Sequence, residues 1–225
     1  MRCSHRNSSC GFTLVELAIV LVIIGLLLAA VFKGQEMIQN AKAKNLVNDL
    51  KGVSAAYYSY QDRYKAIPGD DKAATSHLGQ PAFDGNGDGI ISGAYSDDNA
   101  TISTESQAFW QHTRMAGFMS GTATSTSAPA GTNAMGGLLG VQDGSTTAIY
   151  GMTGPVVCAG SIPWKIAQAV DLMIDDGNSE TGNVRAGAAS ATPNQATAAA
   201  ASLVYGTGAA APASPDELHT LCMKI

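Results

Sequence analysis

Glu16 is the residue whose surroundings most restrict the chemistry of this chain. It lies in a run of 21 residues, Phe12 to Phe32, that is otherwise interrupted only by Thr13. As a helix rising about 1.5 Å per residue, this run crosses roughly 30 Å of hydrocarbon. A carboxylate inside a spanning helix costs about 2.5–3.5 kcal/mol or more, so Glu16 needs a partner there. Thr13 and Glu16 also have the spacing of a capping box, which satisfies the first N–H groups of a helix.

Alternating oxygen side chains form a second candidate site, for which Ca²⁺ is the expected ion. In loop order the candidate ligands are Asp84, Asn86, Asp88, Ile90 and Ser92. Ca²⁺ takes about six to eight oxygens, and short oxygen side chains at alternate positions of a flexible loop can surround one centre. As in an EF-hand-type loop, Ile90 would use its carbonyl and Ser92 would act through a water molecule.

The twelfth position of this loop departs from the EF-hand pattern. Tyr95 stands where an EF-hand has a bidentate Glu, so an acid from elsewhere would have to complete the shell. The candidates for that acid are Asp70, Asp71, Asp97 and Asp98. The alternative is a solvated turn cluster, because Gly, Asp and Asn are common in surface loops. A second acidic turn, residues 175–180, is more typical of a helix end than of a metal site.

Composition argues against several other classes of function. The formal net charge is −5 and no basic cluster follows the apolar run, so we expect no nucleic-acid site. The sequence contains no HExxH, nucleophile elbow, phosphate loop or CxxC pair. His112 has no partner visible in the sequence, His77 lies in a polar loop and His219 lies near the C-terminus. Nucleophilic catalysis needs a base with an orienting group. We therefore expect this chain not to be an enzyme.

The elements that would position these residues predict an α+β fold. A long N-terminal helix is expected over 12–64, because no proline occurs between Phe12 and Pro68 and good helix formers fill 33–64. The membrane-spanning part is 12–32. The second half carries one apolar stripe that should pack under a small globular head over 65–225. The stripe consists of Leu46, Leu50, Val53, Tyr57, Tyr60 and Tyr64.

Within the head, the sequence predicts short antiparallel strands and long loops. Helices are expected from Thr104, where Thr104–Gln107 forms a capping box, to Gly117, and over 163–174. The expected strands are 146–150, 155–158 and, as an edge strand, 221–223. The segments 72–98 and 120–140 are expected as loops. Residues 186–213, rich in Ala, Thr, Ser and Gly, are expected as an exposed low-complexity excursion.

The N-terminal residues resemble the type IV prepilin class. A leader over 1–11 carries two arginines but no acid and ends in Gly11, and Phe12, Glu16 and an apolar helix follow. The resemblance implies that a membrane-embedded prepilin peptidase cuts between Gly11 and Phe12 and that the amine of Phe12 is methylated. It also implies that Glu16 meets the free amine of Phe12 of a neighbouring subunit, since both groups are costly in lipid when alone.

The four cysteines divide between the leader and the head. Cys3 and Cys10 would leave with the leader. Cys158 and Cys222 remain in a domain expected outside the cytoplasm, where disulfides persist. Proteins of the prepilin class commonly pin a C-terminal segment with one bridge, which implies a Cys158–Cys222 disulfide. Two buried free thiols are the alternative.

The resemblance further implies a structural subunit of a type IV pilus-like filament, in which copies of this chain and other pilins assemble helically through the N-terminal helix. The precursor would lie in the inner membrane and the mature chain in an extracellular filament. The alternatives are a pseudopilin in a periplasmic filament of type II secretion and a minor or tip pilin with an adhesive role. A membrane-tethered enzyme is a less favoured alternative.

Overall fold

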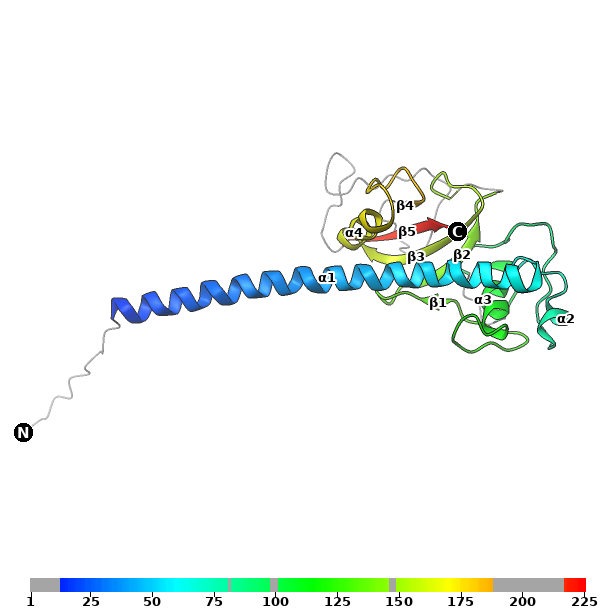
Figure 1. Cartoon of the computed structure of the whole chain (residues 1–225), viewed down its shortest axis with the longest axis horizontal. Coiled ribbons are helices and arrows are strands. Elements are labelled where there is room, and N and C mark those ends of the chain that lie inside the picture. The colour runs from blue at the N-terminus through cyan, green and yellow to red at the C-terminus, as the bar shows by residue number, and fades with distance from the viewer. Residues whose placement is uncertain (1–12, 81, 98–100, 146–148, 188–216) are drawn as a thin grey trace, which may run out of the picture. The chain divides into compact units, whose positions relative to one another are not determined.

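The computed structural model describes residues 13–80, 82–97, 101–145, 149–187 and 217–225, and it has an α+β fold (Figure 1). The helices are α1 (Leu14–Tyr64), α2 (Ala74–Leu78), α3 (Glu105–Met115) and α4 (Trp164–Ile174). The strands are β1 (Gly131–Thr132), β2 (Leu138–Asp143), β3 (Pro155–Pro163), β4 (Val184–Ala186) and β5 (Leu218–Lys224). The predicted fold class, a long N-terminal helix with a small antiparallel head, is confirmed.

The first compact unit of the chain extends to Gln39, and its described part is the beginning of α1. The large apolar side chains from Leu14 to Phe32 are exposed in this unit. Among the described helices, α1 is the one long and apolar enough to cross a membrane, with a mean hydropathy of 3.0 in its most apolar window. Apolar side chains on all sides of a helix require lipid or protein around them, because their exposure to water is unfavourable.

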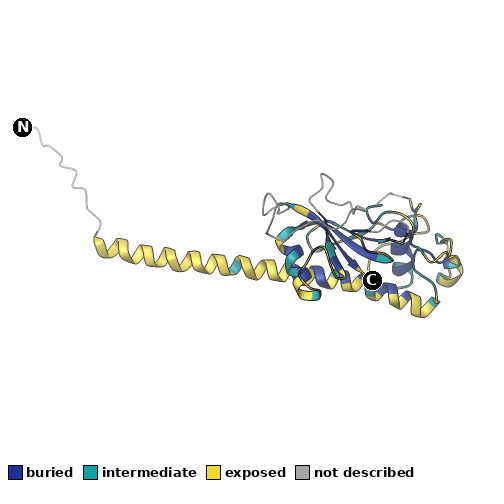
Figure 2. Ribbon diagram, turned by 90° about the horizontal axis from the view of Figure 1, so that it is seen from above, coloured by how far each residue is buried: buried dark blue, intermediate teal, exposed yellow. Residues whose placement is uncertain are grey.

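The second compact unit, Asn40–Ile225, contains the hydrophobic core, to which α1 contributes one face (Figure 2). The buried residues of α1 are Ala43, Leu46, Val47, Leu50, Val53, Ala56, Tyr57 and Tyr60. They include the predicted stripe up to Tyr60, while Tyr64 is half-buried at its end. The helix ends at Tyr64, after which Lys65 has a φ of 55° and Pro68 follows. Proline disfavours helical conformation in the preceding residue, so the helix cannot resume there.

A five-stranded antiparallel sheet with the order β1-β2-β3-β5-β4 packs on this helix face. Side chains of successive strand residues point to opposite faces. Val157 and Leu221 therefore belong to the main core with α1, whereas Cys158 and Cys222 belong to a smaller cluster with Tyr95. The two long strands β3 and β5 form the centre, and their register shifts between residues 159 and 162.

Several predicted elements differ from those observed. The expected loop over 120–140 contains β1 and the start of β2. A side chain at Gly140 would overlap the Tyr95 carbonyl, so the glycines that suggested a loop instead allow this strand to pack closely. Of the strand expected over 146–150, residues 146–148 lie outside the described residues, and Ile149 forms an isolated bridge with Met152. The observed β3 continues beyond the predicted strand to Pro163.

The C-terminal strand was wrongly expected at an edge of the sheet. It lies between β3 and β4, because the unpredicted strand Val184–Ala186 pairs with its other side. The predicted excursion 186–213 begins with Ala186, which ends β4, and residues 188–213 lie outside the described residues. The expected helices are present as α3 and α4, and the predicted capping box at Thr104–Gln107 is confirmed. A short helix, α2, interrupts the expected loop 72–98.

Candidate functional site

The start of α1 holds the first candidate site. The Glu16 Oε2 atom accepts hydrogen bonds from the backbone N–H of Thr13 (2.8 Å) and from its hydroxyl (2.9 Å). The Glu16 N–H in turn donates to Thr13 Oγ1 (3.2 Å), which completes the predicted capping box. Gly11 and Phe12 lie outside the described residues. The carboxylate of Glu16 is thus exposed and is satisfied within its own chain by the residue that follows Phe12.

The acidic loop surrounds two buried carboxylates that come from outside it. Carboxylate oxygens of Asp70, Asp88 and Glu105 lie within 4.8 Å of one another. Asp70 belongs to the turn after α1, Glu105 is the first residue of α3, and both are buried. Within the described residues, the ion pairs at 4 Å or less involve none of these three acids. The fold therefore brings the carboxylates of Asp70, Asp88 and Glu105 close together, with no cation paired to them among the described residues.

Backbone N–H groups of the loop partly compensate this charge. Asp70 accepts from Gly87 (2.6 Å) and Asp88 (3.2 Å) at Oδ1 and from Gly89 (2.7 Å) at Oδ2. Glu105 accepts from the N–H groups of two further loop residues, Asn86 and Ser92, both at 2.9 Å. Burial raises the pKa of Asp70, and the nearby Glu105 acts in the same direction, against the amide hydrogen bonds that lower it.

The five predicted ligands do not all face the cluster of carboxylates formed with Asp70 and Glu105. The Asp84 carboxylate accepts from the N–H of Thr75 in α2 (2.8 Å). Asn86 donates from its side chain to Asp88 (3.0 Å), and Asp88 accepts from the N–H of Ile90 (2.9 Å). Ser92 contributes its N–H to Glu105. These contacts are those of a turn cluster, and they leave the calcium prediction untested.

The acids expected to complete the shell have different surroundings. Asp70 is at the cluster, whereas Asp71 accepts from the Tyr60 hydroxyl (2.7 Å) and contacts His77 (2.6 Å). Asp97 accepts from the N–H of Ala94, and Asp98 lies outside the described residues. Glu105 was not anticipated, because its position in the first turn of α3 explained it as part of a helix start. The spacing of Glu105 from Asp88 in the sequence does not indicate that their carboxylates lie close together, since only the tertiary fold brings the two together.

Aromatic rings and histidines connect the end of α1 to α2 and α3. The ring of Tyr60 stacks on His112 of α3 (centroids 5.8 Å apart), and Tyr64 stacks on His77 of α2 (5.5 Å). His112 accepts the Gly69 N–H at Nδ1 (2.9 Å), so its Nε2 donates to the Phe83 carbonyl (2.7 Å). Burial lowers the pKa of His112. These contacts give His112 a structural role.

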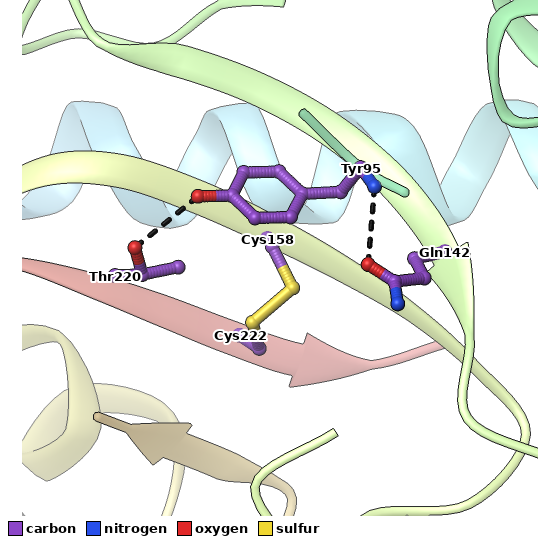
Figure 3. The surroundings of a disulfide bond; sticks show 5 residues. All are labelled: Tyr95, Gln142, Cys158, Thr220 and Cys222. Atoms are coloured by element: carbon purple, nitrogen blue, oxygen red, sulfur yellow. Dashed lines mark hydrogen bonds between the residues drawn. A yellow bond between two sulfur atoms is a disulfide. The ribbon is translucent and has the colours of Figure 1, made fainter. Parts of the chain in front are cut away.

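Cys158 and Cys222 lie directly opposite each other in β3 and β5 and form a disulfide, as expected (Figure 3). Both are fully buried. The ring of Tyr95 lies beside the bridge, its hydroxyl contacts Thr220 (3.2 Å), and its N–H donates to the Gln142 side chain (3.1 Å). Tyr95, the twelfth position of the predicted loop, therefore points into this cluster.

The comparisons with known proteins concern the N-terminal segment. Residues 6–32 match the family model of the prokaryotic N-terminal methylation motif. The comparisons with curated proteins and with solved structures gave no match. The matched segment includes Gly11, Phe12, Glu16 and the apolar run that forms the exposed beginning of α1. This chain carries, at residues 6–32, the signal motif of type IV pilins and pseudopilins.

Proposed function

We propose that this protein is the precursor of a structural subunit of a type IV pilus-like extracellular filament. The observation that carries the proposal is the methylation motif over residues 6–32, which leads directly into an exposed apolar helix. In this proposal prepilin peptidase cuts between Gly11 and Phe12, the mature chain stays in the inner membrane through α1, and assembly transfers it to the filament.

The physical chemistry of α1 favours assembly through this helix. The apolar residues of its first unit have no partner within the described chain, so neighbouring copies or other pilins would replace lipid around them. Glu16 would exchange its bonds to Thr13 for the amine of Phe12 in the next subunit. An unpaired ammonium and an unpaired carboxylate are both unfavourable in such surroundings, so their pairing selects one register between subunits.

A pseudopilin of type II secretion is the second candidate. No proline occurs between Phe12 and Pro68, and α1 is accordingly one helix of 51 residues. Many major pilins have a proline that kinks this helix, so its absence favours a pseudopilin or a minor subunit. A minor or tip pilin with an adhesive role uses the same scaffold, and a membrane-tethered enzyme remains the least favoured alternative.

The test of the main proposal is the mass and location of the mature chain. Intact-mass measurement is expected to give a chain that starts at methylated Phe12, and sheared surface filaments are expected to contain it as a main component. A mature chain that begins after Ala30 would indicate an ordinary signal peptide and contradict the proposal. Processed chain that accumulates only in short periplasmic assemblies would favour the pseudopilin.

We also propose that the loop containing Asp84, Asn86, Asp88, Ile90 and Ser92 holds Ca²⁺. Its support is the chemistry of the donors: the fold adds the buried carboxylates of Asp70 and Glu105 to that of Asp88. A hard divalent cation would relieve the repulsion among these oxygens, which matches the preference of Ca²⁺ for oxygen ligands. In this proposal Asp70 and Glu105 take the place of the missing acid at Tyr95.

A further inference from the structure

Asn86 is the one asparagine of this sequence that is followed by glycine, and its side chain is exposed in the acidic loop. The backbone nitrogen after an asparagine can attack the side-chain carbonyl carbon, and a glycine leaves this attack unhindered because it has no Cβ. Gly87 has a φ of 77°, a conformation that other residues rarely adopt. Residue type and backbone at this position therefore favour a reaction between the Asn86 side chain and its own backbone.

Hydrogen bonds place the reacting groups of Asn86 and Gly87. The attacking N–H of Gly87 donates to the buried Asp70 carboxylate (2.6 Å), which is placed to take the proton that the nitrogen gives up. The side-chain carbonyl of Asn86 accepts from the Asp88 N–H (2.7 Å). This bond closes an Asx turn, in which the side-chain carbonyl folds back toward the following peptide group. It also stabilises negative charge that develops on the carbonyl oxygen during the attack.

Asn133 shows a similar set of hydrogen bonds without the features that permit the reaction. Its carbonyl accepts from the Met135 N–H (2.8 Å), and the Ala134 N–H donates to the Asp49 carboxylate (2.8 Å). The Asn133 side chain is buried, however, and its amide donates to two backbone carbonyls. The Cβ of Ala134 also hinders attack by its nitrogen, so we expect Asn133 to be stable.

Asn178 shares the exposure of Asn86 but not the residue that follows it. Its carbonyl accepts from the Glu180 N–H (3.1 Å), which closes the same kind of turn. Ser179 follows, and its Cβ hinders the attack. Among the described asparagines, Asn86 therefore combines an exposed side chain, a following glycine and a carboxylate at the attacking N–H.

We propose that Asn86 is a self-modification site, which converts to aspartate and isoaspartate in the folded protein. The Gly87 nitrogen forms a bond to Cγ of Asn86, and the bond from Cγ to the amide nitrogen breaks. The amide nitrogen leaves as ammonia, which carries the proton that the Gly87 nitrogen lost. Water then opens the cyclic imide at either of its two carbonyls. The sum exchanges a side-chain amide for a carboxylate, consumes one water and releases one ammonia.

The new carboxylate would change the charge of the acidic loop. It removes the amide that donates to Asp88 (3.0 Å) and places a further negative charge next to the cluster of Asp70, Asp88 and Glu105. These oxygens repel one another without a cation, whereas Ca²⁺ prefers several oxygen ligands. This consequence rests on the proposed calcium loop: a copy that has reacted to aspartate holds Ca²⁺ more tightly than a newly made copy.

Peptide mapping of the full-length protein, kept folded in detergent with chelator at neutral pH, tests the modification. The peptide with Asn86 should show the mass change of an amide-to-carboxylate exchange and divide into aspartate and isoaspartate forms. Peptides with Asn133 and Asn178 should stay unchanged over the same time. A synthetic peptide of residues 82–92 has the same Asn86–Gly87 pair without Asp70, and it should react at least severalfold more slowly because nothing positions its groups.

Two outcomes of this mapping overturn the proposal. One is an Asn86 that stays intact in the folded protein, and the other is a synthetic peptide that reacts as fast as the protein or faster. Asp70→Asn should slow the conversion, because it removes the proton acceptor at Gly87. Asp62→Asn is the control, since Asp62 is an exposed acid at the end of α1 and should leave the conversion unchanged. Melting in detergent checks that each variant is folded.

Melting with and without Ca²⁺ tests the consequence separately. Asn86→Asp should melt at a lower temperature than fresh wild type in chelator and gain more from Ca²⁺. Asn48→Asp adds the same charge at an exposed position of α1 and should respond to Ca²⁺ as the wild type does. Equal gains in Asn86→Asp and wild type would overturn the tighter binding, whereas the mass measurement alone decides the modification. No effect of Ca²⁺ on either protein would contradict the proposed calcium loop itself.

Discussion

At the scale of single residues, Glu16 tests how subunits join. Glu16→Ala removes both the capping box and the charge, so normal processing with a strong loss of filaments is expected. Glu16→Gln separates the two roles, because Gln keeps the capping box but carries no charge. Loss of filaments in both variants, measured as sheared protein per processed chain, would support pairing with the Phe12 amine. Wild-type filament yield from Glu16→Gln would assign Glu16 to capping alone.

Gly140 tests how closely β2 packs. An added methyl group would overlap the backbone carbonyl of Tyr95, so Gly140→Ala should lower the free energy of unfolding by about 1–3 kcal/mol. Gly52→Ala is the control, because Gly52 lies in α1 with open space around its Cα. There alanine should stabilise the helix by about 0.5–1 kcal/mol. Denaturant unfolding in detergent compares the two, and equal stability of both variants would contradict the close packing of β2.

Sequence reasoning at this scale succeeded where chemistry is local or where few partners are available. The Thr13–Glu16 box depends on a spacing of three residues. The disulfide joins residues 64 apart, and it was predicted because only Cys158 and Cys222 remain in the head and the prepilin class commonly has such a bridge. Sequence reasoning missed Glu105 because this residue meets Asp70 and Asp88 only through the tertiary fold. The place of Glu105 in the first turn of α3 already accounts for an acidic residue there, so the sequence around it does not indicate a further role.

At the scale of elements, His112 makes the contact of α3 with the turn after α1 sensitive to pH. Burial lowers the pKa of His112, so the folded protein binds fewer protons than the unfolded chain just below the ordinary value of about 6.5. The stability from this neutral ring is therefore complete above about pH 6.5 and is lost as the pH falls toward the lower folded pKa. The carboxylates of Asp71, Asp84 and Glu105 oppose the shift without reversing it.

The melting temperature in detergent should thus fall between about pH 7 and pH 5. His112→Gln should lower stability at pH 7 and reduce this pH dependence. His219 is also buried with a pKa lowered by burial, so the double variant with His219→Gln should flatten the profile further. Asp71 has a lowered pKa despite its burial, mainly because it bonds to His77, and its contribution is lost only at a more acidic pH. An unchanged slope in His112→Gln would contradict a buried neutral His112.

Long, periodic elements were predictable and short strands were not. The stripe on α1 spans several turns, so its period is clear from Leu46 to Tyr60. The strands β1 and β4 have two and three residues, too few for any period, and they form because β2 and β5 offer them a partner. The error over the edge position of β5 followed directly from missing β4.

At the scale of the whole molecule, the calcium proposal concerns stability. Ca²⁺ that binds the folded loop alone should raise the free energy of unfolding by about 2.7 kcal/mol at a hundredfold excess over the dissociation constant. The full-length protein should therefore melt at a lower temperature in chelator. Asp88→Ala should abolish that difference, whereas Asp62→Ala, which removes an exposed acid paired with Lys65, should keep it. Equal melting in millimolar Ca²⁺ and in chelator would identify the loop as a solvated turn cluster.

The Cys158–Cys222 disulfide between β3 and β5 also keeps the two ends of a long segment joined if the chain between them is cut. Residues 188–216 connect β4 to β5 along the sequence, and Cys158 and Cys222 lie on opposite sides of that connection. One broken peptide bond anywhere within it would leave two polypeptides that the sulfur atoms still hold together. The inner strand β5 would then keep its place between β3 and β4. After such a cut, reduction of the disulfide would remove the last covalent link to the C-terminal fragment, and the pairing of β5 with β3 and β4 alone would hold it.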